Sequence, residues 1–131
     1  MDVLYETNQL RLERNSEVVL LRNKSNQKIL MKEDFLGDAS CGIIDKDGNW
    51  AVVGGEYLLI WTVSQYNKVE EEGLKWIHSL RFKNSEILEI LTDPWSEFSA
   101  VWELNIQSFQ CTKVRDFNDY KNQKYTEEVI W

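Results

Sequence analysis

The sequence has little proline, glycine, cysteine or histidine. Of its 131 residues, one is proline and six are glycine, so no stretch is typical of a flexible linker. We therefore expect a single domain spanning residues 1–131. The two cysteines, Cys41 and Cys111, lie far apart, and the N-terminal stretch lacks the pattern of a secretory signal. These features predict free thiols in a reducing, cytoplasmic compartment.

Metal-binding patterns are also scarce. The two cysteines and one histidine show neither CxxC nor HxxxH spacing, so a tetrahedral zinc shell is not expected. Asp45 and Gly48 belong to a run that looks like part of a calcium loop. Aligning Gly48 with the glycine of such a loop places Ile43 and Gly54 at the first and last ligand positions, and neither has a side-chain oxygen. We expect neither a metal nor a cofactor.

Catalytic motifs are few. There is no GxSxG nucleophile elbow, and the glycines lack the spacing of a phosphate-binding loop. His78 falls on the apolar face of a predicted strand, where a hydrogen-bonded core role is more common than a catalytic one. No sequence motif around Cys111 or His78 indicates a catalytic dyad. A pair of glycosidase carboxylates needs no sequence proximity, so none can be singled out among the 22 acids. We therefore expect a protein that is not an enzyme.

Long hydrophobic runs and positive charge are also in short supply. The longest nearly uncharged apolar stretch, residues 57–63, is far too short to span a bilayer. Fifteen Lys and Arg face 22 Asp and Glu, which gives a net charge of −7. Nucleic acids and anionic membranes bind positive surfaces, so neither is an expected partner. A basic protein is compatible with this charge.

Alternation of apolar and polar residues is the main pattern that is present, and it predicts a mainly β protein. The expected strands and hairpins cover residues 10–13, 17–22 with 28–32, 42–53, 56–63, 74–82, 99–106 and 108–117. Residues 86–91 fit a helix or a strand, residues 67–73 a polar loop, and residues 118–131 a short helix or a docking arm. About eight or nine antiparallel strands with little helix predict a sandwich, a barrel or a propeller-like stack of sheets.

Two of these segments carry more specific expectations. The alternation over residues 74–82 places Leu74, Trp76, His78, Leu80 and Phe82 on one face of a strand. Residues 42–53, GIIDKDGNWAVV, form the clearest hairpin, because Gly48 can adopt the positive φ of a bulged turn. The hairpin pattern resembles a single WG-type repeat at Gly42, Ile43, Ile44, Asp45, Gly48 and Trp50. This resemblance implies a short β-hairpin unit, and it also suggests a module within a larger assembly.

Acids are concentrated in the second part of the chain. Residues 51–131 contain thirteen acids and eight bases, and no Lys or Arg occurs from Asn84 to Thr112. We expect a partner-binding surface of exposed acids and one exposed tryptophan beside Pro94. Its residues are Glu70, Glu71, Glu72, Glu86, Glu89, Asp93, Trp95, Glu97 and Glu103. The alternative is a solvated acidic edge that only prevents aggregation.

In small size, acidity, β-structure and absent catalytic motifs, the chain resembles the immunity proteins of bacterial toxin systems, including contact-dependent growth inhibition. The resemblance implies that the protein neutralises a cognate toxin, often a basic nuclease, and that the acidic surface meets the cations of that toxin. Two alternatives stay open. One is a small-ligand binder built as a β-barrel, with Tyr57, His78 and Cys111 as candidate residues. The other is an adaptor module of a larger assembly.

Overall fold

Twelve strands form three separate antiparallel sheets in the computed structural model, which describes residues 2–35, 37 and 39–131. The expectation of a mainly β protein is confirmed, and the described residues contain no helix. Accordingly, no helix among them is long and apolar enough to cross a membrane. The expected number of eight or nine strands was too low, and the three sheets do not close on one another into a barrel.

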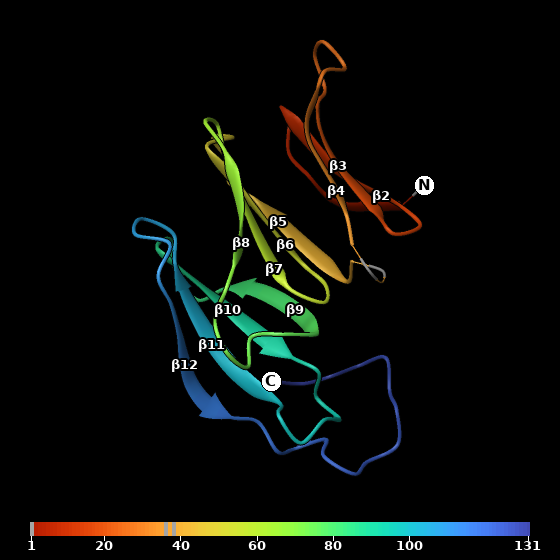
Figure 1. The fold of residues 1–131 in the computed structure, drawn as a ribbon, viewed down its shortest axis with the longest axis vertical. Coiled ribbons are helices and arrows are strands. Elements are labelled where there is room, and N and C mark those ends of the chain that lie inside the picture. The colour runs from red at the N-terminus through yellow and green to blue at the C-terminus, as the bar shows by residue number, and fades with distance from the viewer. Residues whose placement is uncertain (1, 36, 38) are drawn as a thin grey trace.

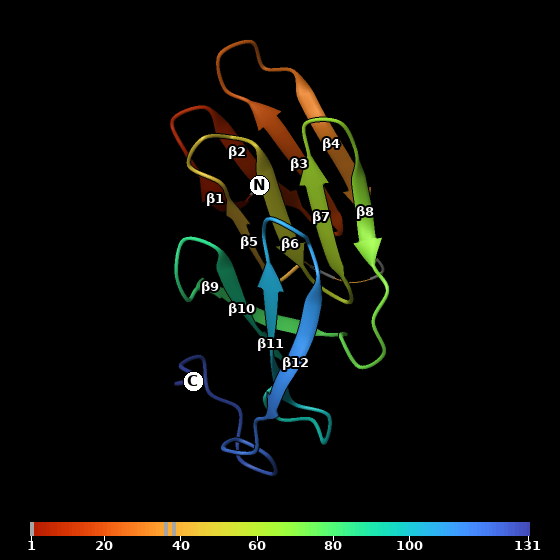
Figure 2. The same cartoon turned by 90° about the vertical axis from the view of Figure 1, so that its left-hand side faces the viewer.

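Each sheet is a meander of four strands that follow one another along the chain. The first sheet consists of β1 (Asp2–Glu6), β2 (Leu10–Asn15), β3 (Val18–Asn23) and β4 (Ile29–Asp34). The second consists of β5 (Cys41–Ile44), β6 (Trp50–Gly54), β7 (Leu58–Thr62) and β8 (Tyr66–Val69). The third consists of β9 (Ile77–Phe82), β10 (Ile87–Thr92), β11 (Ala100–Asn105) and β12 (Cys111–Asp116). The three sheets follow one another along the long axis, with the second in the middle (Figures 1 and 2).

The second sheet is buried on both faces. On β6, Ala51 and Val53 pack into a core shared with the first sheet, whereas Val52 packs into a core shared with the third. The same division occurs on β7, where Leu59 faces the first core and Leu58 the second. Residues 58–61 therefore form a continuous apolar run, as expected for a central strand covered on both sides.

Two glycines let the second sheet approach its neighbours closely. A Cβ atom at Gly42 would lie 2.2 Å from Cδ2 of Leu12 in the first sheet. A Cβ atom at Gly54 would lie 2.4 Å from Cγ2 of Ile77 in the third sheet. The first strands of the sheets accordingly contact one another, β5 against both β1 and β9.

The predicted hairpin at residues 42–53 is confirmed as β5 and β6, paired from Cys41↔Gly54 to Ile44↔Ala51. Gly48 has a φ of 76°, as its place in the turn demands. Its N–H donates to the carbonyl of Asp45 over 2.9 Å, and the N–H of Asn49 donates to an Asp45 carboxylate oxygen over 3.1 Å. The turn chemistry predicted from the sequence therefore closes this hairpin.

Other segments differ from the expectations. Residues 86–91 belong to a strand, β10, which pairs with β9 on one side and β11 on the other. Residues 67–73 were expected to be a loop, but Tyr66–Val69 form the exposed edge strand β8. Strand β1 had not been expected at all. The segment 118–131 forms no helix and instead packs as an arm on the third sheet.

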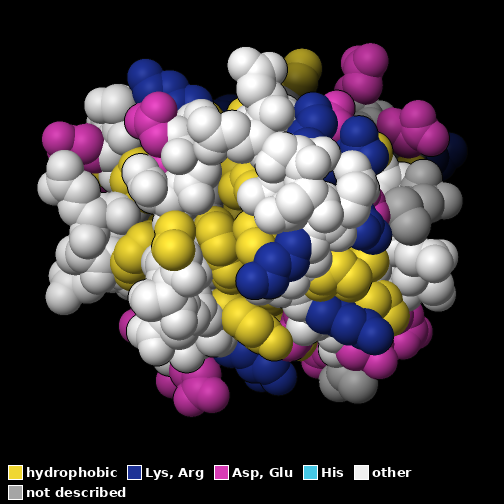
Figure 3. All heavy atoms as spheres, turned by 90° about the horizontal axis from the view of Figure 1, so that it is seen from above, with side chains coloured by type: hydrophobic (Ala, Val, Ile, Leu, Met, Phe, Trp, Pro, Cys, Tyr) yellow, Lys and Arg dark blue, Asp and Glu magenta, His cyan; other side chains and the backbone are white. Residues whose placement is uncertain are grey.

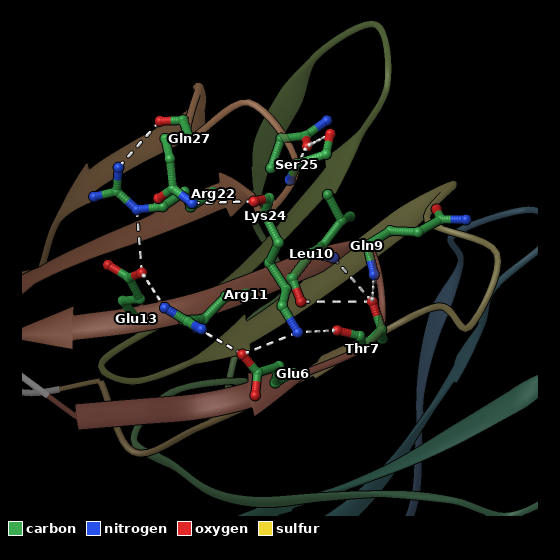
Figure 4. A network of polar contacts seen from close by, with 11 residues as sticks. Glu6, Thr7, Gln9, Leu10, Arg11, Glu13, Arg22, Lys24, Ser25 and Gln27 are labelled. Carbon is green, nitrogen blue, oxygen red and sulfur yellow. Dashed lines mark hydrogen bonds and ion pairs between the residues drawn. The ribbon is translucent and has the colours of Figure 1, made fainter.

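The outer faces of the first and third sheets, at the two ends of the stack, are covered by different kinds of side chain. On the outer face of the third sheet, Tyr120, Val129 and Trp131 of the arm cover Leu91 and Val101. The outer face of the first sheet carries a network of ion pairs instead (Figure 4).

In that network the Glu13 carboxylate is only 3% exposed, and it lies 3.1 Å from Nε of Arg22 and 3.7 Å from a terminal nitrogen of Arg11 (Figure 4). Glu6 joins Arg11 and Lys24 to the network, at 2.6 and 3.3 Å. Charged side chains thus cover this end of the stack.

Candidate functional site

The expected acidic surface does not form as one face. Glu89 and Glu103 do lie opposite each other on β10 and β11. Each is paired with a cation, however: Glu89 with Arg81 at 2.9 Å and Glu103 with Lys83 at 2.7 Å. Both cations come from outside the Lys- and Arg-free stretch, so these two acids present little uncompensated charge.

The remaining acids are spread over several places. Glu86 precedes β10 and Asp93 follows it, and a six-residue strand separates its ends by roughly 20 Å. Glu70–Glu72 are exposed in the β8–β9 connection, where Lys68 and Lys75 line the same hollow. Glu97 is exposed in the β10–β11 connection. Strand pairing thus places Glu86 and Asp93 at opposite ends of β10, while Glu70–Glu72 and Glu97 lie in separate connections, and whether these acids bind a partner stays a prediction.

Trp95, which was expected to be exposed, is half-buried. The arm packs Tyr125 against its ring at a centroid distance of 4.9 Å and Tyr120 at 6.4 Å. The His78 ring lies edge-on at 5.5 Å, and Nε1 of Trp95 is buried without a hydrogen-bond partner. Trp95 is thus part of the contact between the arm and the third sheet, which no pattern near residue 95 indicates.

The exposed tryptophan is Trp76, just before β9, with 59% of its surface accessible. Its φ of 54° lies in the left-handed region, which bulky residues rarely adopt. Hydrogen bonds on both sides hold it there. The Trp76 N–H donates to the Glu56 carbonyl over 2.9 Å, and the Trp76 carbonyl accepts the Asp93 N–H over 2.8 Å. The next N–H, that of Ile77, donates to the Gly55 carbonyl over 2.7 Å.

This backbone geometry corrects the expected strand over residues 74–82. Leu74 and Ile77 are buried, although the alternation placed them on opposite faces, and Trp76 points to solvent although it was grouped with Leu74. The pairing of β9 with β10 also shifts register between Leu91 and Thr92, opposite the start of β9. Regular pairing of β9 with β10 therefore begins only at Ser79, because the register passes over His78.

A small cavity, which we call the Trp76 pocket, lies beside this residue. Its volume is about 170 Å³, and it is lined by Ser40, Gly55, Glu56, Trp76, Ile77, His78 and Asp93. The β6–β7 turn supplies Glu56, and the start of β9 supplies His78. Trp76 is the residue just before β9, and Asp93 is the residue just after β10. The pocket therefore joins the second sheet to the third.

Two carboxylates and a neutral histidine set the electrostatics of the Trp76 pocket. Burial lowers the pKa of His78, although the nearby Asp93 opposes that shift, so the imidazole is neutral at pH 7. Its Nδ1 lies 2.6 Å from the Ser79 hydroxyl oxygen. One oxygen of Asp93 accepts the Trp95 N–H over 3.1 Å, whereas Oε2 of Glu56 is buried without a hydrogen-bond partner.

The residues expected for a small-ligand site do not converge. His78 lines the Trp76 pocket, whereas Tyr57 lies on the hollow of the β8–β9 connection, where it stacks on Phe35 and donates to Glu33. Cys111 borders the second core, and burial raises the pKa of both Cys41 and Cys111 to about 12, so neither is an activated thiol. Within the described ranges no group of three metal-ligating side chains comes together.

Two further hollows are more apolar. One, of about 260 Å³, lies where the first strands of the three sheets meet and includes Tyr5, Ile44, Trp50, Phe82 and Ile106 in its lining.

The other hollow, of about 480 Å³, lies between the hairpin turns of the first two sheets and includes Leu10, Leu30, Trp61 and Val63. On the face seen from above, hydrophobic side chains lie among Lys and Arg, while most of the visible Asp and Glu lie toward the rim (Figure 3). That face is not acidic.

No protein-family model matches the chain, and no curated protein matches it.

Proposed function

We propose that this protein binds and neutralises another protein, a basic toxin domain, as the immunity proteins of bacterial toxin systems do. The observation that carries the proposal is Trp76, a large aromatic side chain that is exposed and whose backbone is held by two hydrogen bonds of its own and one made by the N–H of Ile77. Tryptophan is enriched among the residues that dominate protein interfaces. A backbone that is already fixed loses little conformational entropy on binding.

The charge of the chain supports a basic partner. Its net charge of −7 attracts cations at long range, and Glu56 and Asp93 lie in the pocket beside Trp76. In this proposal Trp76 takes the anchoring role expected of Trp95. Of the acids expected to bind the partner, Glu70–Glu72, Asp93 and Glu97 remain in the proposed surface. Glu86, Glu89 and Glu103 add only to the overall field.

The proposal includes two further points. Four-stranded meanders whose first strands touch are compatible with the propeller-like arrangement among the expected layouts. The unpaired Cys41 and Cys111 are compatible with a reducing cytoplasm as the place of action.

The test is capture of the partner from a native lysate by the tagged protein, washed at low and then high salt, with identification of what is retained. The captured protein is then expressed with and without this chain. We expect it to be basic and toxic, and we expect its toxicity to disappear in the presence of this chain. Failure to retain any protein whose toxicity is suppressed, although a toxin is expressed in that lysate, would contradict the proposal.

A matched pair of variants tests the anchor. We expect Trp76→Ala to weaken binding of the captured partner by 2 kcal/mol or more, about 30-fold, as hot-spot residues do. Val63→Ala, at the exposed β7–β8 turn, is the control and should leave affinity unchanged. Equal affinity of both variants would remove Trp76 from the interface.

Replacing Glu70–Glu72 by Lys should slow association about tenfold at low salt and less at high salt.

The hollow between the three sheets favours one alternative, a small-ligand binder. Apolar and aromatic residues line it together with Thr7, Asp45, Lys46 and Ser85, a mixture that small-molecule sites commonly have. Its volume of about 260 Å³ is slightly below the roughly 300–1,000 Å³ of sites for drug-sized ligands, so it suits a small compound. Thermal stabilisation by a small aromatic compound would support this alternative if an Ile106→Trp variant, which fills the hollow, abolished it. Stabilisation that persists in the variant would place the compound elsewhere.

A further inference from the structure

The size of the Trp76 pocket restricts what it can hold. Its volume of about 170 Å³ is below the roughly 300–1,000 Å³ typical of sites for drug-sized ligands. The pocket therefore suits one functional group or one side chain rather than a whole metabolite. Because it opens beside the exposed Trp76, a side chain from a docked protein can reach it.

Its lining selects for positive charge. Oε2 of Glu56 is shielded from solvent and has no hydrogen-bond partner, which is costly for a carboxylate oxygen. Asp93 has one oxygen engaged by the Trp95 N–H. His78 contributes no positive charge at pH 7, because burial lowers its pKa. The nearest residue of opposite charge in sequence, Lys75, is exposed and does not line the pocket. Two carboxylates are thus left without a cation inside the pocket.

The aromatic residue at the mouth adds to this selectivity. The face of a tryptophan ring attracts ammonium and guanidinium groups more strongly than that of any other side chain. The backbone of Trp76 is hydrogen-bonded to the backbones of Glu56 and Asp93. The side chains of the same two residues supply the carboxylates of the pocket. The hydrogen bonds that strain the backbone at Trp76 therefore also keep the aromatic residue beside the acids.

We propose that the Trp76 pocket binds a single protonated amine or guanidinium group, and that its natural occupant is one Lys or Arg side chain of the partner protein. The inference rests on the proposed function for the source of that side chain. The recognition itself requires only the pocket: the negative charge of Glu56 and Asp93 in its lining, and contact with Trp76.

Binding can be measured without the partner. The probe is Nα-acetyl-lysine methylamide, and the comparison compound is its Nε-acetylated form, which keeps the lysine stem but has an uncharged acetamide in place of the ammonium group. Both are titrated into the protein of residues 1–131 at pH 7 and low salt, and the indole N–H of Trp76 and the amides of Glu56, Ile77 and His78 are followed by NMR. We expect saturable shifts at these four residues with the charged probe only.

Isosteric variants separate the pocket from general attraction. Glu56→Gln and Asp93→Asn remove one charge each, and Asn retains the oxygen that accepts the Trp95 N–H. We expect each to weaken probe binding about tenfold, because a charge-assisted contact is lost. Glu72→Gln removes the same charge from the exposed neighbouring loop and should change affinity less than twofold. Folding of every variant is checked from its amide spectrum.

Equal binding of the charged and uncharged probes would overturn the inference, as would an equal effect of Glu56→Gln and Glu72→Gln. The outcome is separable from that of the proposed function. Binding of the probe at these residues supports the pocket even if no toxin is captured. A captured toxin that binds Glu56→Gln as tightly as the wild type overturns the assignment of the occupant and leaves the proposed function intact.

Discussion

The ionisation of His78, in the third sheet, makes the stability of the fold depend on pH. Burial lowers its pKa, and Asp93 only partly offsets that effect. Between the ordinary histidine pKa of about 6.5 and the lower value in the fold, the unfolded chain binds a proton that the folded chain does not. The stabilising effect of a neutral His78 is therefore present above about pH 6.5 and is lost as the pH falls toward the folded pKa.

We predict that the wild type loses more stability than His78→Gln when the pH is lowered from 7.5 to 5.5. The measurement is the free energy of unfolding in urea at several pH values for both proteins. Carboxylates titrate in both, so their effect cancels in the difference between the two curves. Parallel curves would mean that His78 has the same pKa in the folded and unfolded chains.

The two tryptophans near His78 show what the sequence could not reveal at this scale. Trp95 lies beside a proline in a turn, which predicts exposure, but Tyr120 and Tyr125 from far along the chain cover it. Trp76 lies in an alternating stretch, which predicts an ordinary strand residue. Its left-handed backbone results from hydrogen bonds to Glu56 and Asp93, residues about twenty positions away on either side. Both outcomes depend on tertiary contacts.

At the scale of elements, strands with a buried face were predictable and exposed edges were not. The hairpin at residues 42–53 followed from its turn residues, and β7 from its continuous apolar run. Strand β8 has the sequence Tyr-Asn-Lys-Val, and its residues are mostly exposed, so it has no apolar alternation to detect. It is a strand because β7 offers an unpaired edge, from Leu58↔Val69 to Trp61↔Tyr66.

The close contacts at Gly42 and Gly54 give a prediction at the same scale. Gly54→Ala should destabilise the fold by about 1–3 kcal/mol, as overpacking does, because the new methyl group would lie 2.4 Å from Cγ2 and 2.8 Å from Cβ of Ile77. Gly42→Ala should cost less, since its nearest atom is the end of the Leu12 side chain. Urea unfolding of the two variants measures both values.

Gly37→Ala is the matched control, because a Cβ atom at Gly37 has no other atom within 4 Å. It should change stability by less than about 1 kcal/mol in either direction. If Gly54→Ala were no more destabilising than Gly37→Ala, the second and third sheets would not depend on close approach at that point.

The molecule is a stack of three sheets, and the outer faces of its first and third sheets are covered in different ways. A sheet at the end of a stack has a face that no further sheet covers. On the first sheet, the ion pairs around Glu13 make that face compatible with water (Figure 4). On the third sheet, apolar Leu91 and Val101 require a cover, and the arm of residues 118–131 provides it. The sequence of residues 118–131 alone did not distinguish a short helix from an arm.

The last two residues of the sequence test this role of the arm. Trp131 packs on the third sheet, and the Arg81 guanidinium lies 3.7 Å from its ring centroid, whereas Ile130 is 81% exposed. Trp131→Ala should destabilise the protein by about 1–2 kcal/mol through lost apolar burial and the lost cation–π contact. Ile130→Ala should have an effect within about 0.5 kcal/mol of zero. Chemical unfolding gives both values, and equal stability of the two variants would show that the outer face of the third sheet does not depend on Trp131 for its cover.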